Sequence, residues 1–178
     1  MFWQSVLNGT AGHTYGANGI WQVNTRAKPY GPSPHGTAWG STAWEDAYLL
    51  PGSFQVGLGR KLLERYRWWK FEPHPEWVAP HWTRDNYLLP SAGGIPGEVR
   101  VIFCPQADDK PVVKGLEKGT TYSASLFDPV TGADWPIGTV RPDANGDWQI
   151  AMQQKPLNPF PLFQDWVVVL EAEGARRT

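Results

Sequence analysis

Side chains suited to polyhydroxylated ligands gather early in the chain, between residues 12 and 22. His13 and Tyr15 open this run, and Asn18 and Trp21 follow them. An aromatic face packs on the C–H groups of a sugar, and amide or imidazole groups bond its hydroxyls. A strand over residues 11–15 would point His13 and Tyr15 to the same side, because side chains alternate along a strand. The alternative is a polar strand end that is satisfied by its own loop.

Carboxylates are the second group that could do chemistry. Hydrolysis of a glycosidic bond uses two of them, about 5 Å or about 6.5 to 9.5 Å apart. Glu45 and Asp46 follow Trp44 in a long loop and are the candidates for that role, with the first turn of a helix as the alternative. Glu64 lies four residues after Arg60, which favours a surface ion pair on a helix.

No metal or cofactor site is expected. The run from Asp143 to Asp147 begins like a calcium loop, but Gln154 stands where the bidentate Glu should be, so a tight hairpin turn is the expectation. His35, His74 and His81 match no zinc spacing and are expected at the surface.

Composition limits the class of protein. The 178 residues correspond to one large domain or two small ones, and the 11 Trp are incompatible with general disorder. The net charge of −1 argues against a nucleic-acid or anionic-membrane partner, and the single cysteine, Cys104, is expected as a buried thiol in a strand. Neither a signal peptide nor a membrane-spanning apolar run is expected from the sequence.

Two helices are expected in the first part of the chain. One covers Phe2 to Leu7 and closes at Gly9. The other follows Ser53 as its N-cap, with apolar residues at helical spacing up to Trp69. A first helix without a cap, one short strand, a long loop and one more helix cannot close a core alone. This order is typical of the last repeat of a (β/α)₈ barrel, where loops after the strands build the active site.

The second part has a different character. Short β-rich runs at 98–104, 122–127, 148–152 and 166–170 alternate with turn signals, which is typical of a β-sandwich. A stretch with three prolines precedes it and indicates an extended linker. The expected division is 1–70 as a partial barrel, 71–84 as a linker and 85–178 as a β-sandwich. Trp135 and Trp148 are candidate ligand platforms in that sandwich, although core packing is the expectation for Trp148.

Several motifs carry a resemblance to a known family. The first part resembles the end of the catalytic barrel of apiosidase-like glycoside hydrolases, bacterial enzymes that act on plant polysaccharides. The second part is similar to the C-terminal β domain of collagen-binding type that often follows that barrel. The matching pieces are Gly12–Gly16, Asn18–Gln22, Leu50–Gly52 and Leu62–Glu64 in the first part, and Gly94–Gly97, Val113–Leu116, Phe127–Gly132 and Phe163–Val167 in the second.

The resemblance implies a multidomain α/β plus all-β protein, in which the last βα units of a TIM barrel precede a small antiparallel β-sandwich. It implies that the catalytic carboxylate pair lies upstream of Met1, so that this chain is the inactive C-terminal fragment of a secreted or periplasmic enzyme. In that reading His13, Tyr15, Asn18, Trp21 and Trp44 contact a plant polysaccharide or oligosaccharide. The partner would be the missing N-terminal half of the barrel.

Two other interpretations stay open. In one, the β-sandwich is a non-catalytic module that binds carbohydrate or collagen. In the other, it only covers the side of the barrel. If the strand at 11–15 lacks its neighbours, the apolar faces of both helices are exposed, and residues 1–70 should be unstable alone while the sandwich survives.

Overall fold

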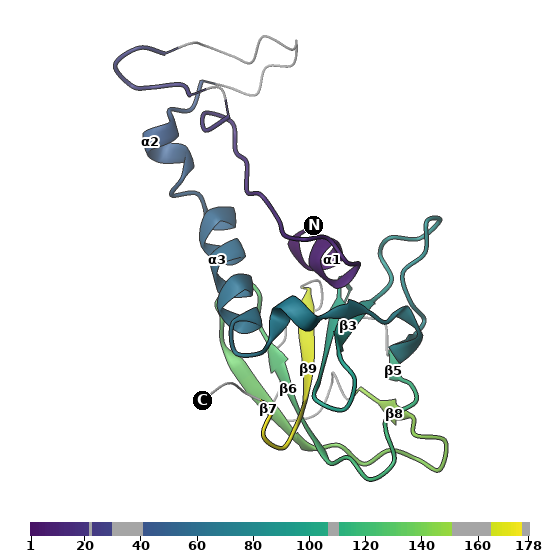
Figure 1. The fold of residues 1–178 in the computed structure, drawn as a ribbon. Helices are drawn as coiled ribbons and strands as arrows, with labels where there is room; N and C mark the ends of the chain where they lie inside the picture. Colours follow the sequence, from purple (N-terminus) through teal and green to yellow (C-terminus); the bar gives the residue numbers. More distant parts are fainter. Residues whose placement is uncertain (22, 30–40, 107–110, 151–164, 176–178) are drawn as a thin grey trace.

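The structure is a computed structural model that describes residues 1–21, 23–29, 41–106, 111–150 and 165–175. Its α-helices are α1 (Phe2–Leu7), α2 (Trp44–Ala47) and α3 (Pro51–Leu63), and two 3₁₀ turns follow at Trp68–Lys70 (η1) and Pro75–Trp77 (η2). Two antiparallel sheets make up the rest of the described fold (Figure 1).

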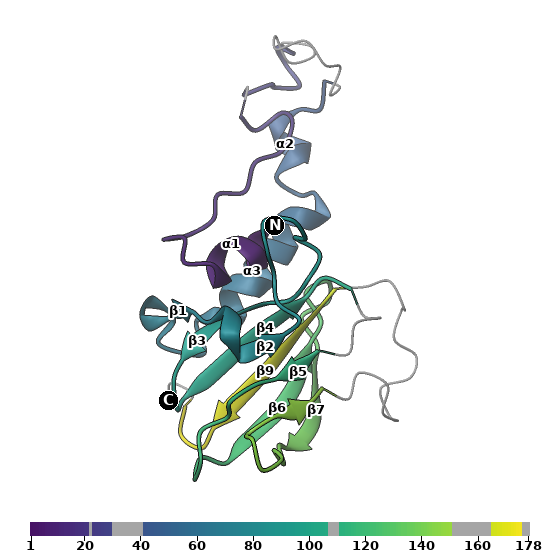
Figure 2. The same ribbon diagram turned by 90° about the vertical axis from the view of Figure 1, so that its right-hand side faces the viewer.

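The larger sheet has six strands in the order β1-β3-β4-β9-β6-β7. The smaller one has three strands in the order β2-β5-β8 and covers one face of the larger sheet (Figure 2). The strands of the larger sheet are β1 (Glu72–Pro73), β3 (Ser91–Ile95), β4 (Val99–Cys104), β6 (Tyr122–Phe127), β7 (Asp134–Thr139) and β9 (Trp166–Ala172), and those of the smaller are β2 (Val78–Ala79), β5 (Val112–Val113) and β8 (Trp148–Gln149).

The central strands of the larger sheet are buried on both faces, because a second layer lies on each side. In β4, Ile102 and Cys104 point into the core between the two sheets, as do Val168 and Leu170 of β9. Their neighbours in the two strands face the helices instead: Val99, Val101, Phe103, Val167 and Val169. Because side chains alternate between the two faces of a strand, one face of the larger sheet contributes to the core between the sheets and the other to the core under the helices.

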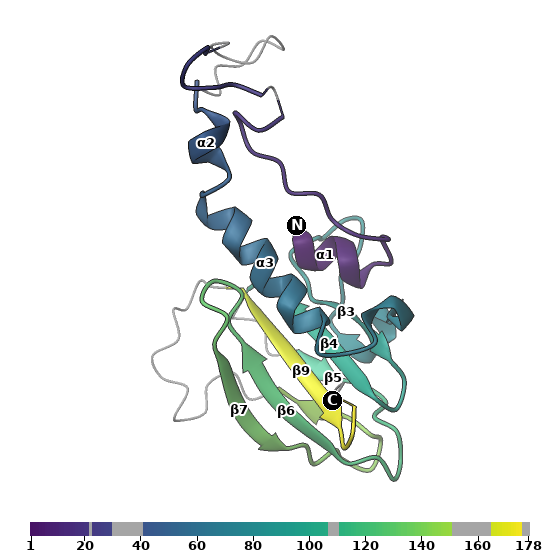
Figure 3. The same ribbon diagram turned by 60° about the vertical axis from the view of Figure 1, so that its left-hand side comes forward.

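Helices α1 and α3 form the layer on the other face of the larger sheet (Figure 3). Trp3 and Leu7 of α1 are buried there together with Leu62 and Leu63 of α3. The two helices also contact each other closely, since a Cβ atom on Gly59 would lie 2.4 Å from the ring of Phe2. An amphipathic helix can bury its apolar stripe against a sheet as well as against a barrel.

Three consecutive residues after α3 tie this helix to the sheet. Arg65 pairs with Asp134 of β7 at 2.7 Å, the Tyr66 hydroxyl donates a hydrogen bond to Glu171 of β9, and Arg67 pairs with Glu98 just before β4. Tyr66 is fully buried. These contacts fix the end of α3 across strands that lie up to 105 residues away in the sequence.

The fold expected for the first part is wrong. Residues 11–15 are not a strand, and the described residues contain no βα unit of a TIM barrel. A strand needs a neighbour to bond its backbone groups, and every strand pair in the described fold is antiparallel and lies among residues 72–172. The multidomain α/β plus all-β description is therefore replaced by helices packed on a two-sheet antiparallel fold.

The stretch expected as a linker takes part in both sheets. Its β1 pairs with β3, and its β2 pairs with β5. A two-residue strand of this kind continues a sheet at its edge, where a proline is tolerated. Residues 71–84 therefore join the helical layer to the sheets through backbone pairing.

Several local predictions are confirmed. Helix α1 closes at Gly9, whose φ is +89°. Strand β6 covers residues 122–127, Cys104 is buried, and Asp143 Oδ1 accepts bonds from Asn145 N and Asp147 N in a tight turn. This turn does not join a hairpin, because β7 before it and β8 after it belong to different sheets. The longer helix begins at Pro51 and not after Ser53, and it ends at Leu63. Proline suits this first position because its missing N–H would have no partner there.

Candidate functional site

The residues expected to contact sugar lie on a projecting part of the molecule, here called the arm: residues 10–21, 23–29 and 41–56. All three ribbon views show α2 and the first half of α3 extending away from the sheets (Figures 1, 2 and 3). Tyr15, Asn18, Trp21 and Trp44 belong to the arm, and His13 stands where the arm meets the helical layer.

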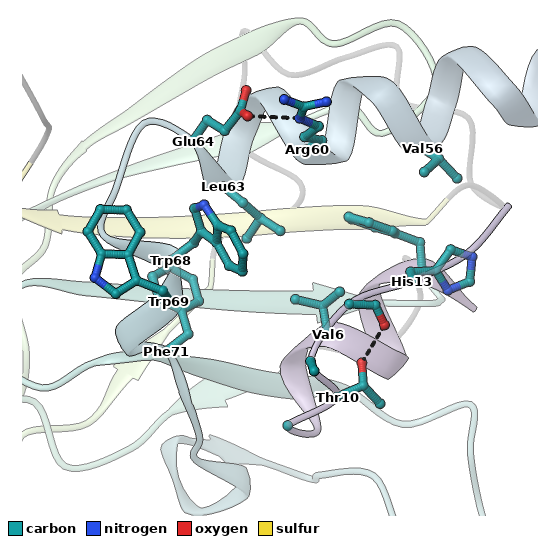
Figure 4. A pocket seen from close by; sticks show the side chains of 14 residues that line it. Val6, Thr10, His13, Val56, Arg60, Leu63, Glu64, Trp68, Trp69 and Phe71 are labelled. Atoms are coloured by element: carbon teal, nitrogen blue, oxygen red, sulfur yellow. Dashed lines mark hydrogen bonds and ion pairs between the residues drawn. The ribbon is translucent and has the colours of Figure 1, made fainter.

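A groove of about 680 Å³ lies at this junction, between α1, α3 and η1 (Figure 4). The Trp68 and Trp69 rings line it, 6.3 Å apart and nearly perpendicular, and Arg60 and Glu64 form an ion pair of 2.8 Å along it. The remaining lining residues are Phe2, Val6, Gly9, Thr10, Ala11, Gly12, His13, Val56, Leu63 and Phe71. An aromatic, mostly apolar groove with a few polar groups is the usual form of a ligand site.

The structure brings only one of the expected sugar contacts, His13, into this groove. The His13 ring packs edge-on against Phe2, with 5.6 Å between the ring centres. Tyr15 lies instead against the start of α3, where a Cβ atom on Gly52 would be 3.1 Å from its ring. His13 and Tyr15 therefore contact different elements, because no strand aligns them.

Asn24 holds the arm together and was not predicted from the sequence. It is fully buried, and its side-chain amide donates bonds of 2.7 and 2.9 Å to the carbonyls of Ser41 and Thr42. Its own carbonyl accepts the Trp44 N–H at 2.7 Å. The side-chain N–H groups and the backbone carbonyl of Asn24 thus both bond the segment at 41–44, and the bond to the carbonyl fixes where α2 begins.

Glu45 and Asp46 stand in the first turn of α2, the alternative that the sequence left open. Asp46 forms an ion pair with Arg26 and raises the pKa of that guanidinium, through its hydrogen bond first and its charge second. Glu45 accepts the backbone N–H of Arg26 through Oε1, while its Oε2 is buried without a hydrogen-bond partner among the described residues. Both acids thus form contacts within the arm, Asp46 with the Arg26 guanidinium and Glu45 with the Arg26 backbone N–H.

A buried polar cluster joins the two sheets. Arg100 of β4 is 1% exposed and lies over the Trp77 ring at 4.3 Å. It donates bonds of 2.8 Å to the carbonyls of Lys114 and Gly115 and pairs with Glu117 at 2.9 Å. Its Nε is buried without a hydrogen-bond partner among the described residues, so the charge is held in the core by these three contacts and the Trp77 ring.

Glu117 also accepts a 2.6 Å bond from the Tyr122 hydroxyl. Burial, and then this bond, raises the pKa of Tyr122. For Glu117, burial acts to raise the pKa, but the bonds from Tyr122 and Arg100 outweigh it and leave the pKa below its ordinary value. The cluster therefore holds a carboxylate in its charged form.

A second hollow, of about 570 Å³, lies on the smaller sheet. Trp148 and Gln149 line it from β8, and Arg141, Asp143 and Asp147 line it from the neighbouring turn. Trp148 also packs against the core between the sheets, as expected for a strand tryptophan. Trp135 of β7 is partly exposed and packs on Trp166, with 5.3 Å between the ring centres.

Membrane-spanning helices and metal clusters are both absent from the part of the chain that the structure describes. No helix among them has the length and hydropathy needed to cross a bilayer. Over the same part of the chain, no three His, Cys, Asp or Glu residues gather closely enough to hold a metal ion.

Comparison with known proteins gives a family match over the first part of the chain and solved structures of similar fold. The family profile described as "Apiosidase-like, catalytic domain" matches residues 1–70. A solved structure named "Glycoside hydrolase" covers 97% of the chain with a TM-score of 0.73 and 20% identity, and 35% of its own chain is matched. A glycoside hydrolase family 5 protein from Bacteroides vulgatus ATCC 8482 covers 97% with a TM-score of 0.68 and 19% identity, and 34% of it is matched.

No curated protein matches the chain. The chain spans about a third of the length of the solved structures it matches. The arm, both helices of the helical layer and the groove fall within the matched residues 1–70 or directly border them. The chain therefore has a glycoside-hydrolase-related fold, and its first 70 residues are similar to an apiosidase-like catalytic domain.

Proposed function

We propose that this chain is the C-terminal portion of an apiosidase-like glycoside hydrolase that acts on plant cell-wall polysaccharide. The observation that carries the proposal is the match of residues 1–70, which contain the arm and most of the groove, to the catalytic domain of that family. The parent enzyme would be secreted or periplasmic, because its polymeric substrate lies outside the cell.

The proposed sugar contacts are His13, Tyr15, Asn18, Trp21 and Trp44. Trp21 and Trp44 are 47% and 42% exposed, so part of each ring is open to solvent, where a sugar face could pack. His13 borders the groove that Trp68 and Trp69 line. No residue of this set is a nucleophile in the proposed reaction.

The catalytic carboxylate pair lies outside this chain in the proposed function. Asp46 is neutralised by Arg26, and both it and Glu45 belong to a single turn of α2. Two adjacent acids in one turn of a short helix do not flank a sugar ring from opposite sides, as the hydrolysis requires. The chain alone is therefore inactive, and the reaction needs the rest of the catalytic domain.

An assay with an aryl glycoside tests whether the catalytic acids lie outside this chain. The isolated chain should release no aryl alcohol above the background rate. Glu45→Gln and Asp46→Asn should behave like the unsubstituted chain. Hydrolysis by the isolated chain that either substitution abolished would place the catalytic acids in α2 and contradict the proposal.

A second function is favoured by the hollow on the smaller sheet. In it, the two-sheet part is a non-catalytic module that binds carbohydrate or collagen, with Trp148 or the partly exposed Trp135 as the platform. Affinity electrophoresis on plant polysaccharides and a collagen pull-down separate the two ligands. Retention that Trp135→Ala or Trp148→Ala removes supports this function, and no retention in either test argues against it.

A further inference from the structure

We propose that the hollow on the smaller sheet binds a uronic acid residue of an acidic polysaccharide, with the sugar ring on Trp148 and its carboxylate on Arg141. The inference rests on the second proposed function, in which the two-sheet part binds carbohydrate, and it adds the class of sugar and the residues that select it. The described residues that line the hollow all lie beyond the matched residues 1–70, so the inference involves none of the side chains assigned to the arm.

The hollow has the dimensions of a small-ligand site. Its volume of about 570 Å³ falls within the roughly 300 to 1,000 Å³ that is usual for ligand pockets. Strands β5 and β8 form one side of it and pair antiparallel, with Val113 opposite Trp148 (Figure 2). The segment that runs from Arg141 to Asp147 forms the other side and leads directly into β8.

Trp148 provides an aromatic face in a fixed position. Its side chain is half-buried and packs on the core between the sheets, while another part of it lines the hollow. A ring that is anchored in this way can pack on the C–H groups of a sugar without first being ordered by the ligand. Trp135 does not line this hollow, because it packs on Trp166 from the edge strand of the larger sheet.

Three of the charged groups around the hollow hold its own walls together. Lys114 forms an ion pair with Asp147, and Asp147 Oδ1 also accepts the Gly115 N–H at 3.4 Å. The bond from Lys114 and then the bond from Gly115 hold the pKa of Asp147 below its ordinary value. Asp143 Oδ1 accepts the N–H groups of Asn145 and Asp147 within the turn. These contacts fix the turn against β5 before any ligand binds.

Arg141 is the charged group that these contacts leave over. It is exposed, and it forms no ion pair or hydrogen bond with the residues that the structure describes, although Asp143 is only two positions away. A guanidinium group binds a carboxylate through two parallel N–H···O bonds, a geometry that lysine does not offer. The hollow therefore combines a donor suited to a carboxylate with an aromatic face.

A uronic acid residue fits both features at once, because it carries a carboxylate directly on a sugar ring. A neutral sugar would use Trp148 and leave Arg141 without a partner, and a simple anion would do the reverse. The second oxygen of Asp143, Oδ2, forms no bond with the described residues and can accept a hydroxyl group of the same sugar. The charges of Arg141, Lys114, Asp143 and Asp147 sum to zero, so recognition depends on the local pairing of Arg141 and not on a general positive field.

Titration calorimetry with the whole chain tests this inference. The probes are a short galacturonate oligomer, the methyl ester of the same oligomer, and a xylo-oligosaccharide that carries glucuronate. The ester keeps the ring and its hydroxyl groups and removes only the charge. Arg141→Gln removes the proposed carboxylate contact, and Trp148→Leu removes the aromatic face but keeps an apolar side chain on the core. Arg84→Gln is the matched control, because Arg84 is exposed, lies outside the hollow and loses the same charge.

We expect at least one uronate to bind about tenfold more tightly than the methyl ester, and Arg141→Gln to remove most of that preference. Trp148→Leu should weaken the acid and the ester alike, since packing on a ring does not depend on charge. Arg84→Gln should change each Kd by less than about twofold. Raising the salt concentration from about 0.05 M to about 0.5 M should weaken binding of the acid more than that of the ester. Tighter binding of galacturonate or of glucuronate identifies the source of the uronate, and either result upholds the inference.

Equal affinity for the acid and the ester would overturn the inference and leave the carbohydrate-binding function standing. An equal loss of preference with Arg84→Gln would also overturn it, because the effect would then come from total charge. Binding of a collagen peptide that Trp148→Leu abolishes, without binding of any sugar, would assign the hollow to a protein ligand. If none of these probes binds, both the inference and the second proposed function are wrong, whereas the aryl glycoside assay tests the hydrolase proposal separately.

Discussion

The hydrogen bond from Tyr66 to Glu171 gives the sharpest test of how the helical layer sits on the sheet. It joins the segment that follows α3 to β9, across 105 residues of sequence. Tyr66→Phe removes only the hydroxyl, because the ring stays packed in the helix-side core. The substitution therefore measures the bond and leaves the apolar packing in place.

The expected cost follows from the burial of the two partners. Tyr66 is fully buried, and its acceptor is a carboxylate, for which a hydrogen bond contributes about 1.5 to 3 kcal/mol. Glu171 is only half-buried, so water can replace part of the lost bond. We expect the free energy of unfolding to fall by about 1.5 kcal/mol, near the lower end of that range.

Urea unfolding followed by tryptophan fluorescence measures this change, with Tyr87→Phe as an exposed control that should stay within about 0.5 kcal/mol. The double-mutant cycle with Glu171→Gln removes the contribution of other contacts made by either residue. A coupling energy of about 1 kcal/mol is expected. Additive effects, or a loss below about 0.5 kcal/mol for Tyr66→Phe, would show that α3 does not end against β9.

Three further predictions concern packing and charge. Gly59→Ala should lower the free energy of unfolding by about 1 to 3 kcal/mol, because its Cβ would meet the Phe2 ring at 2.4 Å. Gly57→Ala in the same helix meets nothing within 4 Å and should raise the free energy of unfolding by up to about 1 kcal/mol. Equal effects of the two substitutions in thermal melts would refute the contact between α3 and α1. Arg100→Ala should cost about 3 to 5 kcal/mol in guanidinium unfolding, since it leaves two carbonyls and a carboxylate without their buried partner, and a loss under about 1 kcal/mol would contradict that burial. The pKa of Glu117 is lower in the folded state than its ordinary value of 4.5, so its contribution to stability is present above that value and is lost as the pH falls through the folded pKa. Glu117→Gln should therefore make the free energy of unfolding fall less steeply with decreasing pH in the acid range. An unchanged slope in that range would contradict the lowered pKa.

The strands that could be predicted were those with full side-chain patterns. Residues 98–104, 122–127 and 166–170 are short β-rich runs between turn signals, and each became a strand of the larger sheet. Strand β3 was missed, because Gly93 and Gly94 in it indicate a turn. Only the packed structure explains them: a Cβ atom on Gly93 would lie about 3 Å from the carbonyls of Glu72 and Leu7.

The candidate site was predictable in its residue types but not in its arrangement. His13 does border a groove, yet of the groove's two tryptophans Trp69 was predicted only as the last apolar position of a helix, and Trp68 was assigned no role. The structural role of Asn24 could not be predicted from the residues next to it, because its side-chain hydrogen bonds reach residues 17 and 18 positions away. Local spacing does not reveal which loop segments a buried amide will join.

The sequence by itself determined that two helices and three strands of the larger sheet form, and which of their faces must leave water, because period and side-chain type act within a few residues of each other. It did not determine what covers those faces. The apolar stripes of α1 and α3 fit the outside of a barrel or the face of an antiparallel sheet equally well, since burial of apolar surface is not directional. That choice was decided by contacts between residues about a hundred positions apart, such as Tyr66 with Glu171, which exist only in the tertiary structure.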